Sequence, residues 1–225
     1  MKRIGHTSSK LKWEGMVFKS KGYGNVIVQE YISCEEVVVK FVNTGSIITT
    51  RSSQIKSGTF KDIYAPTVCS VGVVGGLETQ INGVCVPEYR FWHGMLVRCY
   101  DEVFQGKNPT YKNCGVSDNF KSYKYFYDWC QFQKGFGLHG WQLDKDLLGD
   151  GFLYSEDNCV FIPQRLNSFF KTKGSETVKD CLEHIKTYSK DRVHSLNSIL
   201  EENANELDSR VLKLFDYNER IELFK

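Results

Sequence analysis

Residues 141–170 decide the fold, and they read WQLDKDLLGDGFLYSEDNCVFIPQRLNSFF. An apolar segment ends at Asp144, a glycine-containing loop follows, and a second apolar segment runs from Asn158 to Ile162. Pro163 comes next, and proline suits the beginning of a helix because its φ is already helical and it has no N–H to leave unpaired there. The stretch therefore predicts two strands followed by a helix, which is a ββα unit.

Helices are expected on both sides of this unit, because apolar residues recur there at spacings of three and four. A helix beginning at Glu88 carries its apolar stripe at Tyr89, Trp92, Met95, Leu96, Cys99 and Tyr100. A second helix is predicted at about 120–132, and a third at 175–209 with Ser175 as its N-cap. The apolar side of the third helix comprises Val178, Leu182, Ile185, Leu196, Ile199 and Leu200.

The N-terminal part of the chain has the pattern of short strands joined by tight turns. Valine, isoleucine, tyrosine and threonine dominate the runs 16–18, 25–31, 37–42 and 46–50, and glycine and asparagine separate them. A closing turn is predicted near 54–58. Such short strands cannot bury both faces of an open sheet, which favours a small SH3-like barrel. Residues 63–87, interrupted by proline and glycine, predict a linker with one weak hairpin.

Composition and charge limit the class of protein. The chain has 225 residues, of which 41% are hydrophobic and 25% charged, a composition that excludes disordered, coiled-coil and fibrous proteins. No apolar run reaches the roughly 18 residues that cross a bilayer, and the first residues lack a signal peptide's apolar stretch, so we expect a cytosolic protein without membrane contact. The predicted class is α+β: a barrel in 1–62, a linker in 63–87, a ββα core with flanking helices in 88–174 and a helical tail in 175–225.

The net charge of +2 is unevenly distributed over these parts. Residues 1–62 carry ten Lys and Arg against five Asp and Glu (+5), 63–174 carry eleven of each, and 175–225 carry eight against eleven (−3). A basic N-terminal part suits a polyanion such as nucleic acid. Lys19, Lys21 and Arg51 lie at its predicted turns and strand ends, where long cationic side chains reach phosphates.

The polar residues within 141–170 resemble those of phage-encoded HNH endonucleases, the ββα-metal or His-Me finger family, including free-standing homing endonucleases. Asp144-Lys145 ends the first strand, Asn158 begins the second and Asn167 lies on the helix, at the spacings of that family. The short motifs LDKD at 143–146, YS at 154–155 and CVF at 159–161 are also similar to those of this group. The resemblance covers roughly residues 15–170, because residues 22–62 resemble the N-terminal module found in the same group.

The resemblance implies hydrolysis of phosphodiester bonds in duplex DNA, in the cytoplasm of an infected bacterium. It implies a divalent cation, Mg²⁺ or Mn²⁺, held by the hard oxygen ligands of Asp144 and Asn167. Asn158 would hold the loop by a hydrogen bond across the finger. Arg98, after the apolar stripe of its helix, either pairs with an acid in the core or reaches the phosphate.

The general base is the point at which the sequence departs from the family, because Lys145 stands where a histidine is usual. A lysine is protonated at neutral pH unless its pKa falls by about three units. Asp146 is the other candidate, expected on the same strand face as Asp144. The sequence does not show which of Lys145 and Asp146 is the general base. His139, in a loop between glycines, is a weaker third candidate.

Two further hypotheses remain open beside the nuclease. A protein that kept the finger as a scaffold would bind DNA without cutting it, because Lys145 replaces the histidine. A phage factor could instead use the acidic tail to bind a host or viral protein. A structural zinc is disfavoured, because the intervals between Cys99, Cys114, Cys130 and Cys159 contain no close pair.

Overall fold

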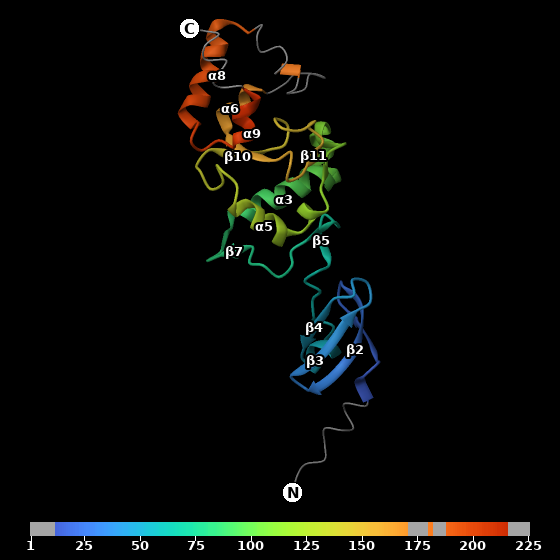
Figure 1. Ribbon diagram of the computed structural model, residues 1–225. Coiled ribbons are helices and arrows are strands. Elements are labelled where there is room, and N and C mark those ends of the chain that lie inside the picture. The colour runs from blue at the N-terminus through green and yellow to red at the C-terminus, as the bar shows by residue number, and fades with distance from the viewer. Residues whose placement is uncertain (1–11, 171–179, 182–187, 216–225) are drawn as a thin grey trace. The chain divides into compact units, whose positions relative to one another are not determined.

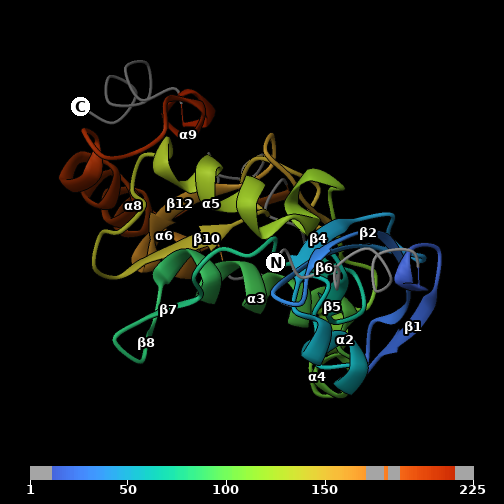
Figure 2. The same cartoon turned by 90° about the horizontal axis from the view of Figure 1, so that it is seen from below.

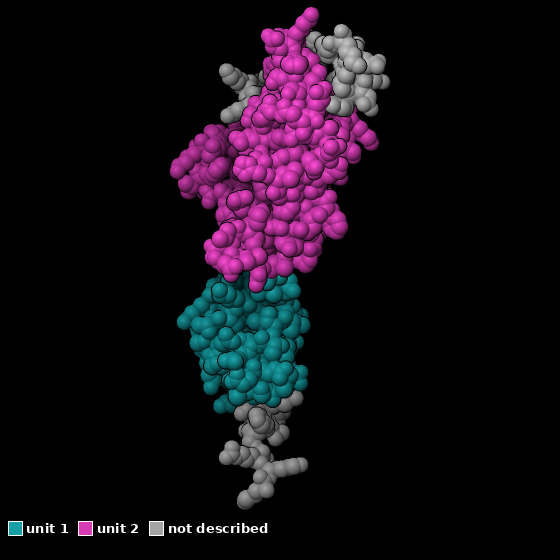
Figure 3. Space-filling view, turned by 90° about the vertical axis from the view of Figure 1, so that its left-hand side faces the viewer, with its two compact units in different colours: residues 1–67, 73–76 teal, residues 68–72, 77–225 magenta. Residues whose placement is uncertain are grey.

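The computed structural model describes residues 12–170, 180–181 and 188–215, and its fold is mixed α+β (Figures 1 and 2). The chain divides into two compact units (Figure 3). Unit 1 comprises residues 1–67 and 73–76, and unit 2 comprises residues 68–72 and 77–225. The predicted α+β class is confirmed at this level.

Unit 1 is built on an antiparallel sheet with the strand order β1-β2-β3-β4. The strands are β1 (Val17–Ser20), β2 (Gly24–Ser33), β3 (Glu36–Phe41) and β4 (Ile47–Thr50). Alternate side chains of β2 and β3 are fully buried, including Val26, Val37, Val39 and Phe41. This period of two is what a sheet with one face on a core requires. The four predicted strands are confirmed within two residues at each end, and the SH3-like barrel stays a prediction.

The closing turn expected near 54–58 is wrong, because the chain forms the helix α2 (Ser52–Ser57) there. Ile55 of α2 is buried in the cluster that contains Phe41 and Phe60. Gly58 ends the helix at a φ of 68°, and a Cβ at this position would lie 2.8 Å from the carbonyl oxygen of Lys19. Glycine is therefore needed both for the left-handed backbone and for the close approach.

Two short ladders occupy the stretch that was predicted to be a linker with one hairpin. The strands β5 (Pro66–Val68) and β6 (Gly72–Val73) pair, and so do β7 (Gln80–Ile81) and β8 (Val84–Cys85). Each strand has only two or three residues. They are too short for a sequence pattern of period two to show.

Helices dominate the first half of unit 2. Its elements are α3 (Pro87–Tyr100), α4 (Glu102–Lys107), η1 (Pro109–Tyr111), β9 (Gly115–Val116), η2 (Asn119–Lys121) and α5 (Tyr123–Gln131). The apolar stripe of α3 is buried as predicted, with Trp92, Met95 and Leu96 fully enclosed. The indole N–H of Trp92 donates to the carbonyl oxygen of Phe120, 2.7 Å away, which joins α3 to the segment before α5.

The ββα unit predicted from residues 141–170 is confirmed. Strand β10 (Trp141–Asp144) pairs antiparallel with β12 (Val160–Pro163), and α6 (Gln164–Phe169) follows and packs on both strands. Between them, β11 (Leu153–Tyr154) pairs in parallel with β9. Pro163 is the last strand residue and the N-cap, with ψ at 140°, so the helix begins one residue later than its helical φ suggested.

The helix expected over 175–209 is confirmed in α8 (Lys190–Asn203) but is not continuous, because the described residues 188–189 and 204–208 are not helical. A further helix, α9 (Ser209–Leu214), follows where no separate helix was predicted. Asp208 caps α9 by accepting a hydrogen bond from the backbone N–H of Arg210. Ser175, Val178, Leu182 and Ile185 lie outside the described residues. None of the described helices is long and apolar enough to cross a membrane.

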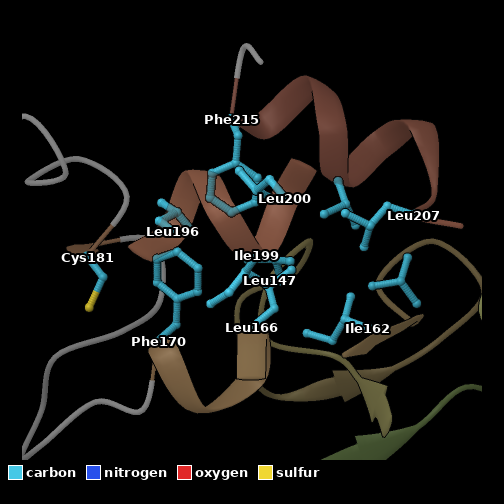
Figure 4. Close-up of a cluster of buried hydrophobic side chains, with 12 residues drawn as sticks. Leu147, Ile162, Leu166, Phe170, Cys181, Leu196, Ile199, Leu200, Leu207 and Phe215 are labelled. Carbon is cyan, nitrogen blue, oxygen red and sulfur yellow. The ribbon is translucent and has the colours of Figure 1, made fainter. Parts of the chain in front are cut away.

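One hydrophobic cluster unites the ββα unit with these helices (Figure 4). Strand β12 and helix α6 contribute Ile162 and Leu166, and α8 contributes Leu196, Ile199 and Leu200. All five side chains are at most 3% exposed. Helix α9 contributes Val211 to the same cluster, so α8 and α9 share one core with the ββα unit. Burying each such side chain contributes about 1.5–3 kcal/mol.

Candidate active site

Asp144 is the last residue of β10 and lies at the centre of the candidate site. It is only 5% exposed. Its Oδ1 accepts the backbone N–H groups of Asp146, at 3.1 Å, and Leu147, at 2.8 Å, which turns the chain out of the strand. Its Oδ2 accepts no hydrogen bond from any described residue. Burial raises the pKa of Asp144 to about 6, and the charge of Asp146 acts in the same direction.

Lys145 is a buried cation, 5% exposed. Its Nζ lies 2.5 Å from Oδ1 of Asp146, and it lies over the rings of Tyr111 and Tyr154 at 5.7 and 5.3 Å. Burial alone would lower the pKa of Lys145, but the charge and hydrogen bond of Asp146 outweigh it and raise the pKa instead. Lys145 therefore stays an ammonium ion, which is the wrong state for a general base.

Asp146 does not share a strand face with Asp144, so that expectation is wrong. The strand ends at Asp144, and Asp146 lies in the turn that follows, with its backbone N–H on the Asp144 carboxylate. Its side chain is 42% exposed while it pairs with Lys145. Of the two candidate bases, Asp146 is thus the one whose side chain is open to water.

Arg98 lies beside the same group of residues. Its Nε donates to the hydroxyl of Tyr154 at 2.9 Å, and its guanidinium carbon lies 5.5 Å from the centre of that ring. Burial strongly raises the pKa of Tyr154, so its hydroxyl stays neutral. Among the described residues Arg98 forms no ion pair with a carboxylate, and the core ion pair that was one alternative for it is not seen. Two cationic side chains, those of Arg98 and Lys145, thus contact the ring of Tyr154.

Asn158 lies across the loop that connects the two strands. Its Nδ2 donates to the carbonyl oxygen of Leu153 at 3.2 Å, and its backbone N–H bonds to Oγ of Ser155 at 3.3 Å. A Cβ on Gly149 would lie 2.8 Å from Cγ of Asn158, so the asparagine side chain packs directly on the loop backbone. The residue belongs to the turn before β12 and not to the strand.

Asn167 reaches β10 from α6. Its Nδ2 donates to Oε1 of Gln142 at 2.9 Å. Gln142 precedes Asp144 by two residues in the strand, so the two side chains share one face. The helix therefore presents Asn167 to the strand face that also carries Asp144. Gln142 and Tyr154 are site residues that the sequence analysis did not identify. Gln142 could have been identified, because it lies two residues before Asp144 in a predicted strand and therefore on the same face.

The remaining candidates belong to other parts of the chain. Lys19, Lys21 and Arg51 are exposed residues of unit 1, and Arg51 pairs with Glu35 at 2.8 Å. His139 is exposed in the loop before β10, at the opposite end of that strand from Asp144.

The four cysteines considered for zinc are buried thiols, and burial raises the pKa of both Cys99 and Cys159 to about 12. The described residues contain no group of three or more His, Cys, Asp and Glu side chains that could hold a metal ion.

The donor set can still be tested against a hard cation. Mg²⁺ commonly takes one or two protein carboxylates and keeps several waters, so it does not require three acidic ligands. Asp144 offers a buried oxygen that accepts no hydrogen bond from the described residues. Gln142 on the same strand face, and Asn167 bonded to Gln142, offer carboxamide oxygens. The buried position that raises the pKa of Asp144 also disfavours its ionised form, which an adjacent cation would stabilise. The residues fit such an ion.

Comparisons with known proteins returned no counterpart: no protein-family model, no curated protein and no solved structure matches the chain.

Proposed function

We propose that the chain is a divalent-metal-dependent DNA endonuclease of the phage homing type, which hydrolyses phosphodiester bonds in double-stranded DNA within the infected bacterium. The proposal combines an HNH-like ββα site in unit 2 with an SH3-like, DNA-binding unit 1. The observation that supports it most is the arrangement around Asp144: a buried carboxylate with one oxygen that accepts no hydrogen bond from the described residues, a helix residue, Asn167, bonded to Gln142 of the same strand, and a following loop tied by Asn158.

Asp144 and Asn167 are the residues proposed to hold Mg²⁺ or Mn²⁺, which would draw charge from the scissile phosphate and stabilise the leaving oxygen. The chain's own groups supply the rest. Arg98, bonded to the hydroxyl of Tyr154, places a positive charge beside the site, where it favours a phosphate that gains negative charge. Lys145, over the same ring, is paired with Asp146 and adds a net charge only when Asp146 takes up a proton. Asp146 is the residue proposed to take the proton of the attacking water.

A second candidate, a DNA-binding protein without cleavage, is favoured by one specific observation. Oδ1 of Asp146 accepts a hydrogen bond from the ammonium of Lys145, 2.5 Å away, so this oxygen is already occupied by a donor and is less available to an attacking water. In this alternative, Asp144 and Asn158 keep their structural contacts, and the finger is a scaffold.

Cleavage of phage genomic DNA and supercoiled plasmid, with Mg²⁺, with Mn²⁺ and with EDTA, separates the two candidates. We expect metal-dependent cutting by the natural chain and a 10²- to 10⁴-fold slower rate for Asp146→Asn, the usual loss on removing a general base. Asp150→Asn is the matched control, because Asp150 is an exposed aspartate of the same loop whose Oδ1 accepts a hydrogen bond from the backbone N–H of Phe152. Equal rates for Asp146→Asn and Asp150→Asn would remove Asp146 from the chemistry.

Salt-dependent DNA binding without cutting under any metal condition would establish the second candidate instead. Lys145→His would then be the informative variant, since a histidine needs no large pKa shift to accept a proton. Gain of cleavage in that variant would show that the remaining ligands are competent.

A further inference from the structure

The turn before β12 is held from its outer side by a residue of the C-terminal helix α9. The guanidinium of Arg210 donates to three backbone carbonyl oxygens: from Nη1 to Glu156 at 3.2 Å and Asp157 at 2.9 Å, and from Nη2 to Cys159 at 3.3 Å. These three carbonyls flank Asn158 on both sides. One planar side chain thus spans the whole turn that carries the proposed loop-holding asparagine.

Arg210 is itself fixed in orientation. Asp208 accepts from Nε of Arg210 at its Oδ1 and from Nη2 at its Oδ2, both at 3.1 Å, so the carboxylate aligns the guanidinium plane. The same Asp208 caps α9. Helix α9 is anchored by Val211, which is fully buried, and by Phe215 immediately after it at 1% exposure. Figure 4 shows Leu207 and Phe215 pointing into the cluster that contains Ile162 of β12.

The inner side of the turn is held by Asn158, whose Nδ2 bonds to Leu153 and whose Cγ packs on Gly149. The turn therefore lies between two clamps, one from the loop and one from α9. Removing the outer clamp leaves Asn158 attached to a turn whose carbonyls must find other donors. The position of the loop that carries Lys145 and Asp146 would then be less well defined.

We infer that Arg210 is a positioning residue for the candidate site, which couples the C-terminal helix to the geometry of the Asn158 turn. The inference rests on the proposed function, because the turn matters for catalysis only if the site cleaves DNA. Arg210 touches no proposed metal ligand or base, so it acts through the turn alone.

The experiment compares Arg210→Met, which keeps most of the side-chain volume, with Arg165→Met as the matched control. Arg165 is an exposed arginine of α6 that pairs with Glu202 and does not bond to the turn. We expect kcat on duplex DNA to fall about 10- to 100-fold in Arg210→Met with KM within twofold, as is typical when an outer support of a metal site is lost. Added guanidinium ion should restore part of the rate in Arg210→Met and none in Arg165→Met.

Amide hydrogen exchange supplies a readout that does not need cleavage. The N–H of Cys159 donates to the carbonyl oxygen of Ser155 across the same turn. We expect it to exchange faster in Arg210→Met, and to a smaller extent in Asp208→Asn, while Arg165→Met matches the natural chain. Asp208→Asn also serves if Arg210→Met does not fold.

The outcomes separate the two claims. If the natural chain does not cleave DNA but the Cys159 amide exchanges faster in Arg210→Met, the clamp is supported and the proposed function is not. Unchanged exchange in a folded Arg210→Met would overturn the inference. So would faster exchange accompanied by an undiminished kcat.

Discussion

Replacing Asp144 by asparagine should have two opposite effects, loss of cleavage and gain of stability. Asparagine has nearly the same shape, and its Oδ1 can still accept the N–H groups of Asp146 and Leu147 that form the turn. What it lacks is the negative charge. The substitution therefore separates the structural work of the Asp144 side chain from the cost of burying its charge.

The magnitude follows from the pKa of Asp144, which burial raises from 3.8 to about 6. A raised pKa means that the folded protein binds the proton more tightly than the unfolded chain does. The stabilising contribution is therefore fully present below about pH 4 and is lost as the pH rises through 6. A pKa that is higher by about two corresponds to about 3 kcal/mol in the free energy of unfolding. Since asparagine does not titrate, the Asp144→Asn variant should gain about 3 kcal/mol relative to the natural chain between pH 4 and pH 7.

The assay is urea unfolding of both proteins at a series of pH values, in EDTA so that no cation neutralises the carboxylate. Both proteins carry Trp13→Phe, which removes the tryptophan of unit 1. The three remaining tryptophans, Trp92, Trp129 and Trp141, all lie in unit 2, so fluorescence reports the unfolding of the unit that contains the site. Linear extrapolation yields the free energy at each pH, provided that unit 2 unfolds in one step.

A stability difference that does not change between pH 4 and pH 7 would refute the reasoning, because Asp144 would then titrate as an exposed aspartate does. Adding Mg²⁺ at pH 7 provides a second comparison. A ligand of the folded state stabilises by mass action, so the natural chain should gain stability with increasing Mg²⁺ and Asp144→Asn should gain none.

Other substitutions test the loop, helix α4 and the basic unit. Gly149→Ala should lower stability by about 1–3 kcal/mol, since its Cβ would lie 2.8–3.0 Å from backbone and side-chain atoms, and equilibrium unfolding measures this. Gly106→Ala in α4, with open space at its Cβ, should instead raise stability by about 0.5–1 kcal/mol. Lys19→Gln and Lys21→Gln should each reduce the slope of log affinity for DNA against log salt by about one, whereas Lys124→Gln, paired with Asp128, should leave it unchanged. An unchanged slope in both lysine variants of unit 1 would exclude that surface from the DNA contact.

Sequence patterns predicted the elements that are long enough to show a period. Helix α3 has 14 residues, and its stripe from Trp92 to Cys99 repeats over several turns. Helix α2 has six residues, fewer than two turns, and its Gln54-to-Gly58 end has the composition of a turn. Its formation depends on burying Ile55 against side chains from the sheet, which no local pattern reveals.

The candidate site was predictable in its spacing and unpredictable in its environment. Asp144 at the end of a strand and Asn167 on the helix lie where the ββα pattern placed them, whereas Asn158 lies in the turn before β12 and not at the start of that strand. The position of Tyr154 follows from the parallel pairing of β11 with β9, a long-range contact between two-residue strands. Arg98 and Lys145 therefore meet on that ring because of a pairing with β9, which lies outside residues 141–170.

The charge state of Lys145 shows why environment decides the chemistry. A buried ammonium without a counter-ion would lose its proton, and sequence alone permits that outcome. Here the neighbouring carboxylate of Asp146 lies within hydrogen-bond distance, so the cation is retained and the two residues act as one neutral pair. Changing either member alone leaves the other with an unbalanced charge, and the buried member is Lys145. For this reason Asp146→Asn should shift the state of Lys145 as well as remove a base, and the double variant with Lys145→Met is the comparison that isolates the carboxylate.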